Sequence, residues 1–207
     1  MRGRKIKTLF SYILIGAGAF LLFQGARNFL ESRWGQRTAA REFQQEMPEA
    51  APQAPAPARP EPGEAIAKLT IPRLDAKLYI VEGVDTADLR RGPGHMPGTA
   101  MPGADGNCVI AGHRDTHFRV LKDIRRGDDI VLQTNGGQFL YRVKSTQIVP
   151  PTDTAVLNPT TQPTLTVITC YPFYYLGAAP KRFIVRAELA GALNASSFSS
   201  ETGRHPS

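Results

Sequence analysis

Three side chains in this 207-residue chain stand at the ends of apolar runs and could together do nucleophilic chemistry. Cys170 closes the run Thr-Leu-Thr-Val-Ile-Thr-Cys, His113 follows Asn-Cys-Val-Ile-Ala-Gly, and Arg182 opens Arg-Phe-Ile-Val. Such runs are typical of β-strands, so each group would be held rigidly at a strand end near solvent. A thiol is a nucleophile, an imidazole transfers protons, and a guanidinium, which stays charged, stabilises an anion.

Each of these residues also has an ordinary structural interpretation: a packing cysteine, a hydrogen-bonded histidine and a solvated arginine at a strand edge. A disulfide between Cys108 and Cys170 is a further alternative, since exported proteins meet oxidising conditions. The chain would then be a non-catalytic, membrane-anchored β-barrel module for binding or assembly. A metal site from both cysteines, His113 and His117 is not expected, because the sequence has no Cys-x2-Cys pair and no Glu directly after the first His. We expect neither a metal nor a cofactor.

The elements that would position these groups are mainly strands. Short runs rich in Val, Ile, Leu, Thr or Tyr, bounded by Gly, Pro, Asn or Asp, predict strands at 66–71, 78–81, 107–111, 130–133, 139–149, 165–169 and 183–189. Asn-Gly-Gly at 135–137 predicts a hairpin turn. Helical spacing is confined to 85–91, 118–124 and 154–157. The pattern predicts an all-β fold, a closed or nearly closed barrel of about seven or eight strands with short helical connections.

The N-terminal region predicts a membrane anchor. Residues 8–26 carry no charge, and as a helix they would span roughly 28 Å, close to the hydrocarbon thickness of a bilayer. Arg2, Arg4, Lys5 and Lys7 precede them, so the positive-inside rule keeps residues 1–7 in the cytoplasm and sends the rest outside. We expect a single-pass protein of the bacterial cytoplasmic membrane, with cleavage of this segment as a signal peptide the alternative.

Between the anchor and the predicted barrel lies a segment of different composition. Residues 27–63 are expected to hold a short juxtamembrane helix and then, from residue 47, a Pro- and Ala-rich extended linker. The catalytic domain is expected at 64–191 and a flexible tail at 192–207. Residues 1–63 contain nine Lys or Arg and five Asp or Glu, so they carry +4 of the net charge of +7. The charge therefore serves membrane orientation, and no nucleic-acid partner is expected.

A resemblance to the sortase family, most of all to its class D members, is carried by four stretches. These are Pro-Gly-His-Met-Pro-Gly-Thr at 93–99, Gly-His-Arg-Asp-Thr at 112–116, Thr-Val-Ile-Thr-Cys-Tyr-Pro-Phe at 166–173 and Ala-Pro-Lys-Arg-Phe at 179–183. The resemblance covers residues 64–190, with Val167 where Leu is usual and His117 where an aromatic is usual. Sortases are membrane-tethered cysteine transpeptidases with an eight-stranded barrel, and the resemblance implies this fold and activity here.

The resemblance also implies a role for each strand-end residue. Cys170 would attack the Thr carbonyl of a Leu-Pro-x-Thr-Gly or Leu-Pro-x-Thr-Ala sorting signal and form a thioester. His113 would protonate the leaving amine and later deprotonate the incoming one. Arg182 would stabilise the tetrahedral oxyanion and hold the substrate backbone. The implied partners are secreted proteins with a C-terminal sorting signal and an amine acceptor, either a cell-wall precursor or a pilin lysine.

Further residues near these motifs are candidates for substrate binding. Thr169 precedes the nucleophile and would position the substrate, or serve only as a β-branched strand residue. The loop after Cys170 is unusually aromatic, with Tyr171, Phe173 and Tyr175 as either an apolar wall for the substrate or core filling. As accessory residues of the site we name His95, Asp115 and His117.

Overall fold

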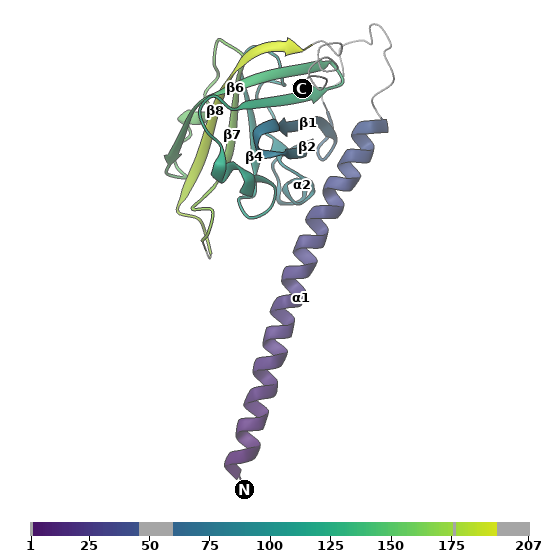
Figure 1. Cartoon of the computed structure of the whole chain (residues 1–207), viewed down its shortest axis with the longest axis vertical. Helices are drawn as coiled ribbons and strands as arrows, with labels where there is room; N and C mark the ends of the chain where they lie inside the picture. The colour runs from purple at the N-terminus through teal and green to yellow at the C-terminus, as the bar shows by residue number, and fades with distance from the viewer. Residues whose placement is uncertain (1, 46–59, 176, 194–207) are drawn as a thin grey trace, which may run out of the picture.

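The computed structural model describes residues 2–45, 60–175 and 177–193, except for the side chains of residues 2–13, 28, 29, 32 and 193. One long helix, α1 (Arg2–Gln45), lies against a β-barrel with its C-terminal part and extends away from the barrel with the rest (Figure 1). The helical connections are short: η1 (Pro72–Leu74), α2 (Thr86–Arg91), η2 (His117–Asp123) and η3 (Ala155–Leu157).

The barrel is closed and has eight strands, which confirms the predicted fold class. They are β1 (Ala65–Ile71), β2 (Ala76–Glu82), β3 (Gly94–His95), β4 (Asn107–Gly112), β5 (Asp129–Thr134), β6 (Gly137–Val149), β7 (Thr164–Tyr171) and β8 (Lys181–Leu193). Around the barrel they follow the order β1-β2-β3-β4-β7-β8-β6-β5. The β2–β3 and β4–β7 pairs are parallel, and the others are antiparallel. All seven predicted strands are present, and β3, with two residues, is the one the sequence did not predict.

The alternation of the strands fills the barrel with one hydrophobic core. In β1 every second residue is buried, and Leu69, Ile110 and Val167 meet inside. Phe118 of η2 packs into this core at the end of β4, directly against Gly112. A Cβ at Gly112 would lie 2.6 Å from Cδ2 of Phe118, so glycine is required for η2 to close this end of the barrel.

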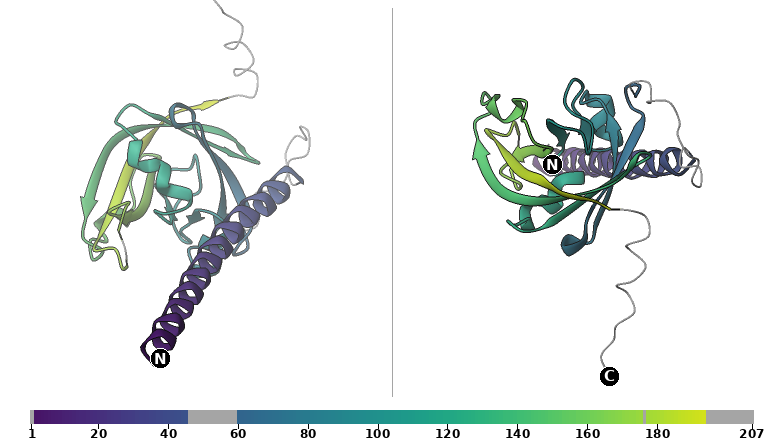
Figure 2. Two further views of the ribbon diagram at one scale, coloured as in Figure 1. Left: turned by 60° about the horizontal axis from the view of Figure 1, so that its bottom comes forward. Right: turned by 90° about the horizontal axis from the view of Figure 1, so that it is seen from above.

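Helix α1 is one continuous element where the sequence predicted a short juxtamembrane helix. Its last turns are docked on the barrel, with Ala39 and Phe43 buried against Ala65 and Val81. The side-chain amide of Gln36 pairs with the edge of β2: its Nε2 donates to the carbonyl of Tyr79 at 3.0 Å, and the Tyr79 N–H donates to its Oε1 at 2.8 Å. Figure 2 shows this part of α1 running along the flank of the barrel. The domain that was predicted to begin at residue 64 therefore packs against residues of α1, which precede it in the chain.

The predicted membrane span, linker and tail each lie partly outside the described residues. Within the residues that the structure describes, no helix is long and apolar enough to cross a bilayer, so the predicted span at 8–26 is not supported. The side chains of its first six residues lie outside the described part. The predicted linker lies outside it from 46 to 59, and the predicted tail from 194 onward, while Ala192 belongs to β8.

Candidate active site

Three neighbouring strands bring His113, Cys170 and Arg182 to one level. Cys170 on β7 pairs directly with Arg182 on the antiparallel strand β8. On the other side of β7, Thr169 pairs with Gly112 in the parallel ladder to β4, so His113 comes level with Cys170 one residue later. Directly paired residues point to the same face of a sheet, and adjacent strands lie about 4.8 Å apart. Cys170 and Arg182 are therefore neighbours on adjacent strands, and His113 directly follows the last paired residue of β4; we call these three positions the catalytic row.

The catalytic row lies on the outer face of the barrel. Val167 lies three residues before Cys170, and Val185 lies three residues after Arg182. Both valines therefore point to the opposite face, into the core. Ile168 and Ile184 share the face of the row and join Val149, Val156 and Leu157 in a separate aliphatic group, the outer cluster. Val156 and Leu157 belong to η3 in the connection from β6 to β7, which folds over this face. A mainly buried aliphatic group, with Leu157 and Ile168 half-buried, therefore adjoins the strand ends of the row.

The two cysteines differ in environment and are not joined. Both are free thiols, with Cys170 half-buried and Cys108 1% exposed. Burial first, and then the charge of Glu82, raises the pKa of Cys108 to about 12, so this thiol stays protonated and unreactive. Cys108 pairs with Leu165, and five residues of β7 place Cys170 roughly 16 Å further along the strand. The alternative of a Cys108–Cys170 disulfide is therefore wrong.

Main-chain carbonyls near the start of β8 hold the side chain of Arg182. Its Nη1 donates to the carbonyls of Lys181 at 3.0 Å and Ala179 at 3.3 Å, just before β8. A guanidinium has five N–H donors, so further donors remain for a ligand. The row thus consists of a thiol and a guanidinium on paired residues, with an imidazole at the end of the next strand.

The accessory residues Asp115 and His117 lie beside His113, around a small pocket of about 230 Å³ that also includes Glu31 of α1. His117 is buried, and its pKa is lowered to about 4, mainly by burial and next by the neighbouring His113. His117 is therefore neutral at neutral pH and does not compete with His113 as a charged acid. Asp115 is exposed.

His95 lies away from the row and has a structural environment. It pairs with Ile110 of β4, three residues before His113, which is roughly 10 Å back along the strand. The ring is buried, with Nδ1 2.7 Å from Oε2 of Glu82 and Nε2 3.1 Å from Oγ1 of Thr99. Both nitrogens have partners, so the structure does not bring His95 into the site as an accessory residue.

The residues predicted to bind substrate divide between core and surface. The hydroxyl of Thr169 is buried and donates to the carbonyl of Gly112 at 2.7 Å, which ties β7 to β4 next to the row. Phe173 packs against the core and, with Tyr171, against the ring of Phe183. Tyr175 is 48% exposed. Core filling thus accounts for Phe173, whereas Tyr175 stays accessible to a ligand.

Arg114 is a site residue that the sequence reasoning missed. Its Nη2 donates to the carbonyls of Tyr175 at 2.9 Å and Gly177 at 3.0 Å, and its guanidinium lies 5.7 Å from the centre of the Tyr175 ring. Arg114, which directly follows His113, therefore ties the loop between β7 and β8 to the segment after β4. In the described part of the chain, its Nη1 is the one buried side-chain polar atom without a hydrogen-bond partner. The polar group Gly-His-Arg-Asp after an apolar run was the available signal.

Among the residues with described side chains, no three of His, Cys, Asp and Glu gather closely enough to hold a metal ion.

Comparisons with known proteins point to one family. The family model of the sortase domain matches residues 69–190. Sortase D of Bacillus subtilis is 41% identical over a region covering 61% of this chain and 65% of that protein. Sortase SrtE1 of Streptomyces coelicolor is 37% identical, over 54% of this chain and 37% of that protein. The match thus spans less than two thirds of the length of either curated relative.

Solved structures of similar fold point to the same family. A sortase D5 transpeptidase of Clostridium perfringens aligns with a TM-score of 0.66 and 28% identity, over 76% of this chain and 99% of that one. The catalytic domain of SrtD of Bacillus anthracis aligns with a TM-score of 0.56 and 35% identity, over 69% of this chain and 98% of that one.

Proposed function

The chain belongs to the sortase family, and we propose that it is a cysteine transpeptidase in which Cys170 is the nucleophile, His113 the proton carrier and Arg182 the oxyanion stabiliser. The observation that supports the proposal is the register of two ladders: Cys170 pairs with Arg182, and Thr169 pairs with Gly112, the residue before His113. The second thiol of the chain is buried and protonated, which leaves Cys170 as the candidate nucleophile.

The first half of the proposed reaction forms a thioester. The Cys170 sulfur, as thiolate, attacks the carbonyl carbon of Thr in the sorting signal, and the carbonyl oxygen becomes an oxyanion beside Arg182. When the tetrahedral intermediate collapses, the peptide bond breaks and His113 gives its proton to the departing amine. Thiolate, imidazolium and guanidinium are then replaced by a neutral thioester, a neutral imidazole and the unchanged guanidinium.

The second half reverses these steps with a new amine. The acceptor amine attacks the thioester carbonyl, and His113 takes the proton that the amine loses. A new amide bond forms as the Cys170 sulfur leaves, which restores the thiolate and imidazolium. Arg182 does not move a proton in either half, because a guanidinium keeps its charge at every working pH.

The surroundings of the row support an extended peptide as substrate. Leu157 and Ile168, the half-buried members of the outer cluster, are apolar side chains near Cys170 that suit the Leu and Pro side chains of a Leu-Pro-x-Thr-Gly or Leu-Pro-x-Thr-Ala signal. The proposed substrates are secreted proteins with such a signal at their C-terminus, and the acceptor is the amine of a cell-wall precursor or a pilin lysine.

The proposed location is the outer side of the bacterial cytoplasmic membrane, with α1 as the attachment. Sortases are generally membrane-associated or extracytoplasmic. The uncharged stretch 8–26 and the large exposed apolar side chains of α1, Leu14, Ile15, Phe20, Leu21, Leu22 and Phe23, support this location. Basic residues precede this stretch, which supports an N-terminus on the cytoplasmic side.

Trapping of the acyl-enzyme tests the proposal. The full chain is incubated with a Leu-Pro-x-Thr-Gly peptide and analysed by mass spectrometry. We expect an adduct on Cys170 with the mass of the peptide up to Thr, and transfer of the acyl group when an amine is added. Cys170→Ala should form no adduct, and Cys108→Ala is the matched control that should form it. An adduct in Cys170→Ala, or none in the wild type with any signal of a peptide library, would refute the proposal.

A further inference from the structure

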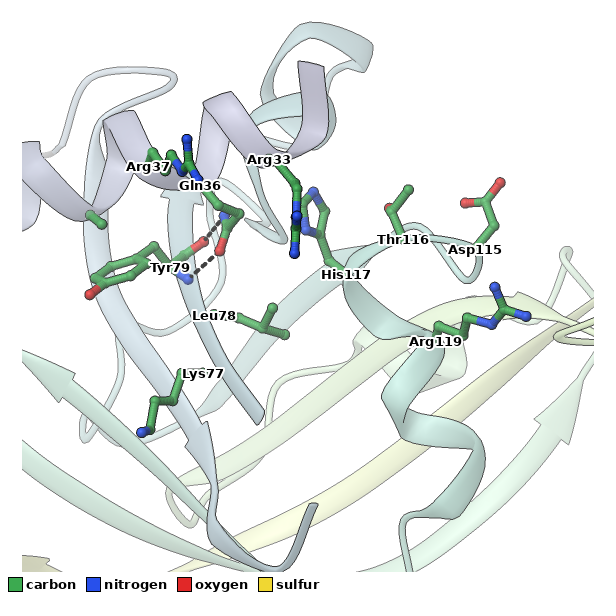
Figure 3. A pocket seen from close by; sticks show the side chains of 11 residues that line it. Arg33, Gln36, Arg37, Lys77, Leu78, Tyr79, Asp115, Thr116, His117 and Arg119 are labelled. Atoms are coloured by element: carbon green, nitrogen blue, oxygen red, sulfur yellow. Dashed lines mark hydrogen bonds between the residues drawn. The ribbon is translucent and has the colours of Figure 1, made fainter. Parts of the chain in front are cut away.

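A second cavity lies between α1 and the barrel, on the other side of the segment that carries Asp115 and His117. It has a volume of about 700 Å³, within the roughly 300–1,000 Å³ of small-molecule sites. Three elements form its walls, as Figure 3 shows: Arg33, Gln36, Arg37 and Ala40 of α1; Lys77, Leu78 and Tyr79 of β2; and Asp115, Thr116, His117 and Arg119 at and before η2. We call it the basic cleft.

The charge of the basic cleft is strongly one-sided. Four cationic side chains line it, Arg33, Arg37, Lys77 and Arg119, against one carboxylate, Asp115. Among the described residues, Arg37 and Lys77 have no acidic partner. The guanidinium of Arg119 lies 5.0 Å from the centre of the Tyr174 ring, a contact that leaves its charge in place. The cations come from all three lining elements and lie around the cleft, so an anion that enters it is attracted from several sides.

The arginines of α1 face the barrel because of their spacing. Residues 33, 36, 37 and 40 recur at intervals of three and four, which places them on one side of the helix. On this side Gln36 fixes the helix, through its two hydrogen bonds to Tyr79 and a third from Nε2 to the carbonyl of Arg91 at 2.9 Å. An ion pair between Glu42 and Arg91 at 2.7 Å adds to this docking. The basic cleft is therefore formed before any ligand arrives, which lowers the entropic cost of binding.

We propose that the basic cleft is a binding site for a small phosphorylated ligand. A phosphate group carries about −1.5 to −2 charges and three acceptor oxygens, so one or two such groups match the excess of cations in the lining. Guanidinium forks bind phosphate oxygens in pairs, and an ammonium adds a point charge. The volume of the cleft, about 700 Å³, suits a compact headgroup better than an extended nucleic-acid backbone. Asp115 and His117 form a wall common to this cleft and the pocket of His113, so a bound ligand would lie next to the proposed catalytic machinery.

Calorimetric titration of the full chain in non-ionic detergent with inorganic pyrophosphate tests the site. At about 0.01 M salt, where charges are little screened, we expect saturable binding with a Kd below about 1 mM. The double variant Arg37→Gln/Lys77→Gln should weaken binding at least about tenfold, because two charged contacts are lost. The control pair Arg41→Gln/Arg126→Gln removes the same charge, once on α1 and once on the barrel, from exposed residues outside the cleft lining. It should change the Kd by about twofold or less.

Two results would overturn the proposal: no saturable binding by the wild-type chain, or equal weakening by both pairs of substitutions. A second arm separates the sources of the phosphate. Detergent micelles doped with phosphatidylglycerol compete with pyrophosphate if the ligand is a lipid headgroup, and this competition is lost in the double variant. A soluble phosphate compound is the ligand if pyrophosphate binds without such competition. The readout is binding, so the outcome is independent of the transpeptidase proposal.

Discussion

The docking of α1 on the barrel can be tested by truncating one buried ring. Phe43 is 3% exposed and meets the ring of Tyr79 edge-on, with 6.0 Å between ring centres. Phe43→Ala removes this ring from contact with Ala65 and Val81. Truncation of a fully buried Phe costs about 3–5 kcal/mol. Here the helix can shift to close part of the space, so we expect a loss of about 2–4 kcal/mol in the free energy of unfolding.

The measurement is urea unfolding of the full chain in detergent, followed by far-ultraviolet circular dichroism. Trp34→Ala is the matched control, because Trp34 is an aromatic residue of the same helix that is 69% exposed. The control should change the free energy of unfolding by no more than about 0.5 kcal/mol. A loss below about 1 kcal/mol for Phe43→Ala, or equal losses in both variants, would contradict the docked position of α1.

A chain that begins at residue 60 tests the same contact from the other side. The sequence alone predicts that a protein starting near Glu64 is soluble and active. The structure predicts instead that its barrel exposes Ala65, Val81 and the edge of β2 at Tyr79, and that it unfolds at lower urea concentration than the full chain. Equal stability of the two proteins would show that the α1 contact adds nothing.

Three further outcomes are expected. Iodoacetamide at neutral pH should label Cys170 in the folded chain and Cys108 only after denaturation, because burial holds the pKa of Cys108 near 12; rapid labelling of both would contradict the described core. Arg114→Ala should speed chymotrypsin cleavage in the β7–β8 loop several-fold, since two carbonyl contacts are lost, and an unchanged rate would refute the role of this contact. Asp128→Asn should cost about 1–3 kcal/mol at neutral pH through loss of the contact with Arg73. Because Arg73 lowers the pKa of Asp128, this stability is present above the ordinary carboxyl pKa and is lost as pH falls through the lowered one, so urea midpoints of the two proteins should converge in acid.

Much of the barrel could be predicted from the sequence because its strands alternate or run apolar between turn residues. Seven strands were found in this way, with ends within a few residues of those observed. The strand β3 was not predicted because its two residues, Gly94 and His95, are too few to show the two-residue alternation of a strand. The docking of α1 was not predicted because it depends on single residues, Gln36 and Phe43, whose partners are distant in sequence.

In the candidate site, too, local sequence predicts some features, and contacts between distant residues decide the others. The positions of Cys170, His113 and Arg182 at strand ends follow from local sequence, whereas their common level depends on the register of two ladders. His95 looked like an accessory residue because it stands in a polar, Gly-rich motif, and burial beside Glu82 explains it better. Arg114 was missed because its partners are backbone carbonyls of a distant loop, which no side-chain pattern reveals.

The ends of β7 and β8 at Cys170 and Arg182 are aligned by main-chain hydrogen bonds, and His113 directly follows β4. The connection before β7 can therefore change in length and composition while these strand ends keep their spacing. A fold arranged in this way lends itself to diversification of substrate choice. Exchange of this connection between related barrels is accordingly a rational route to altered peptide selectivity.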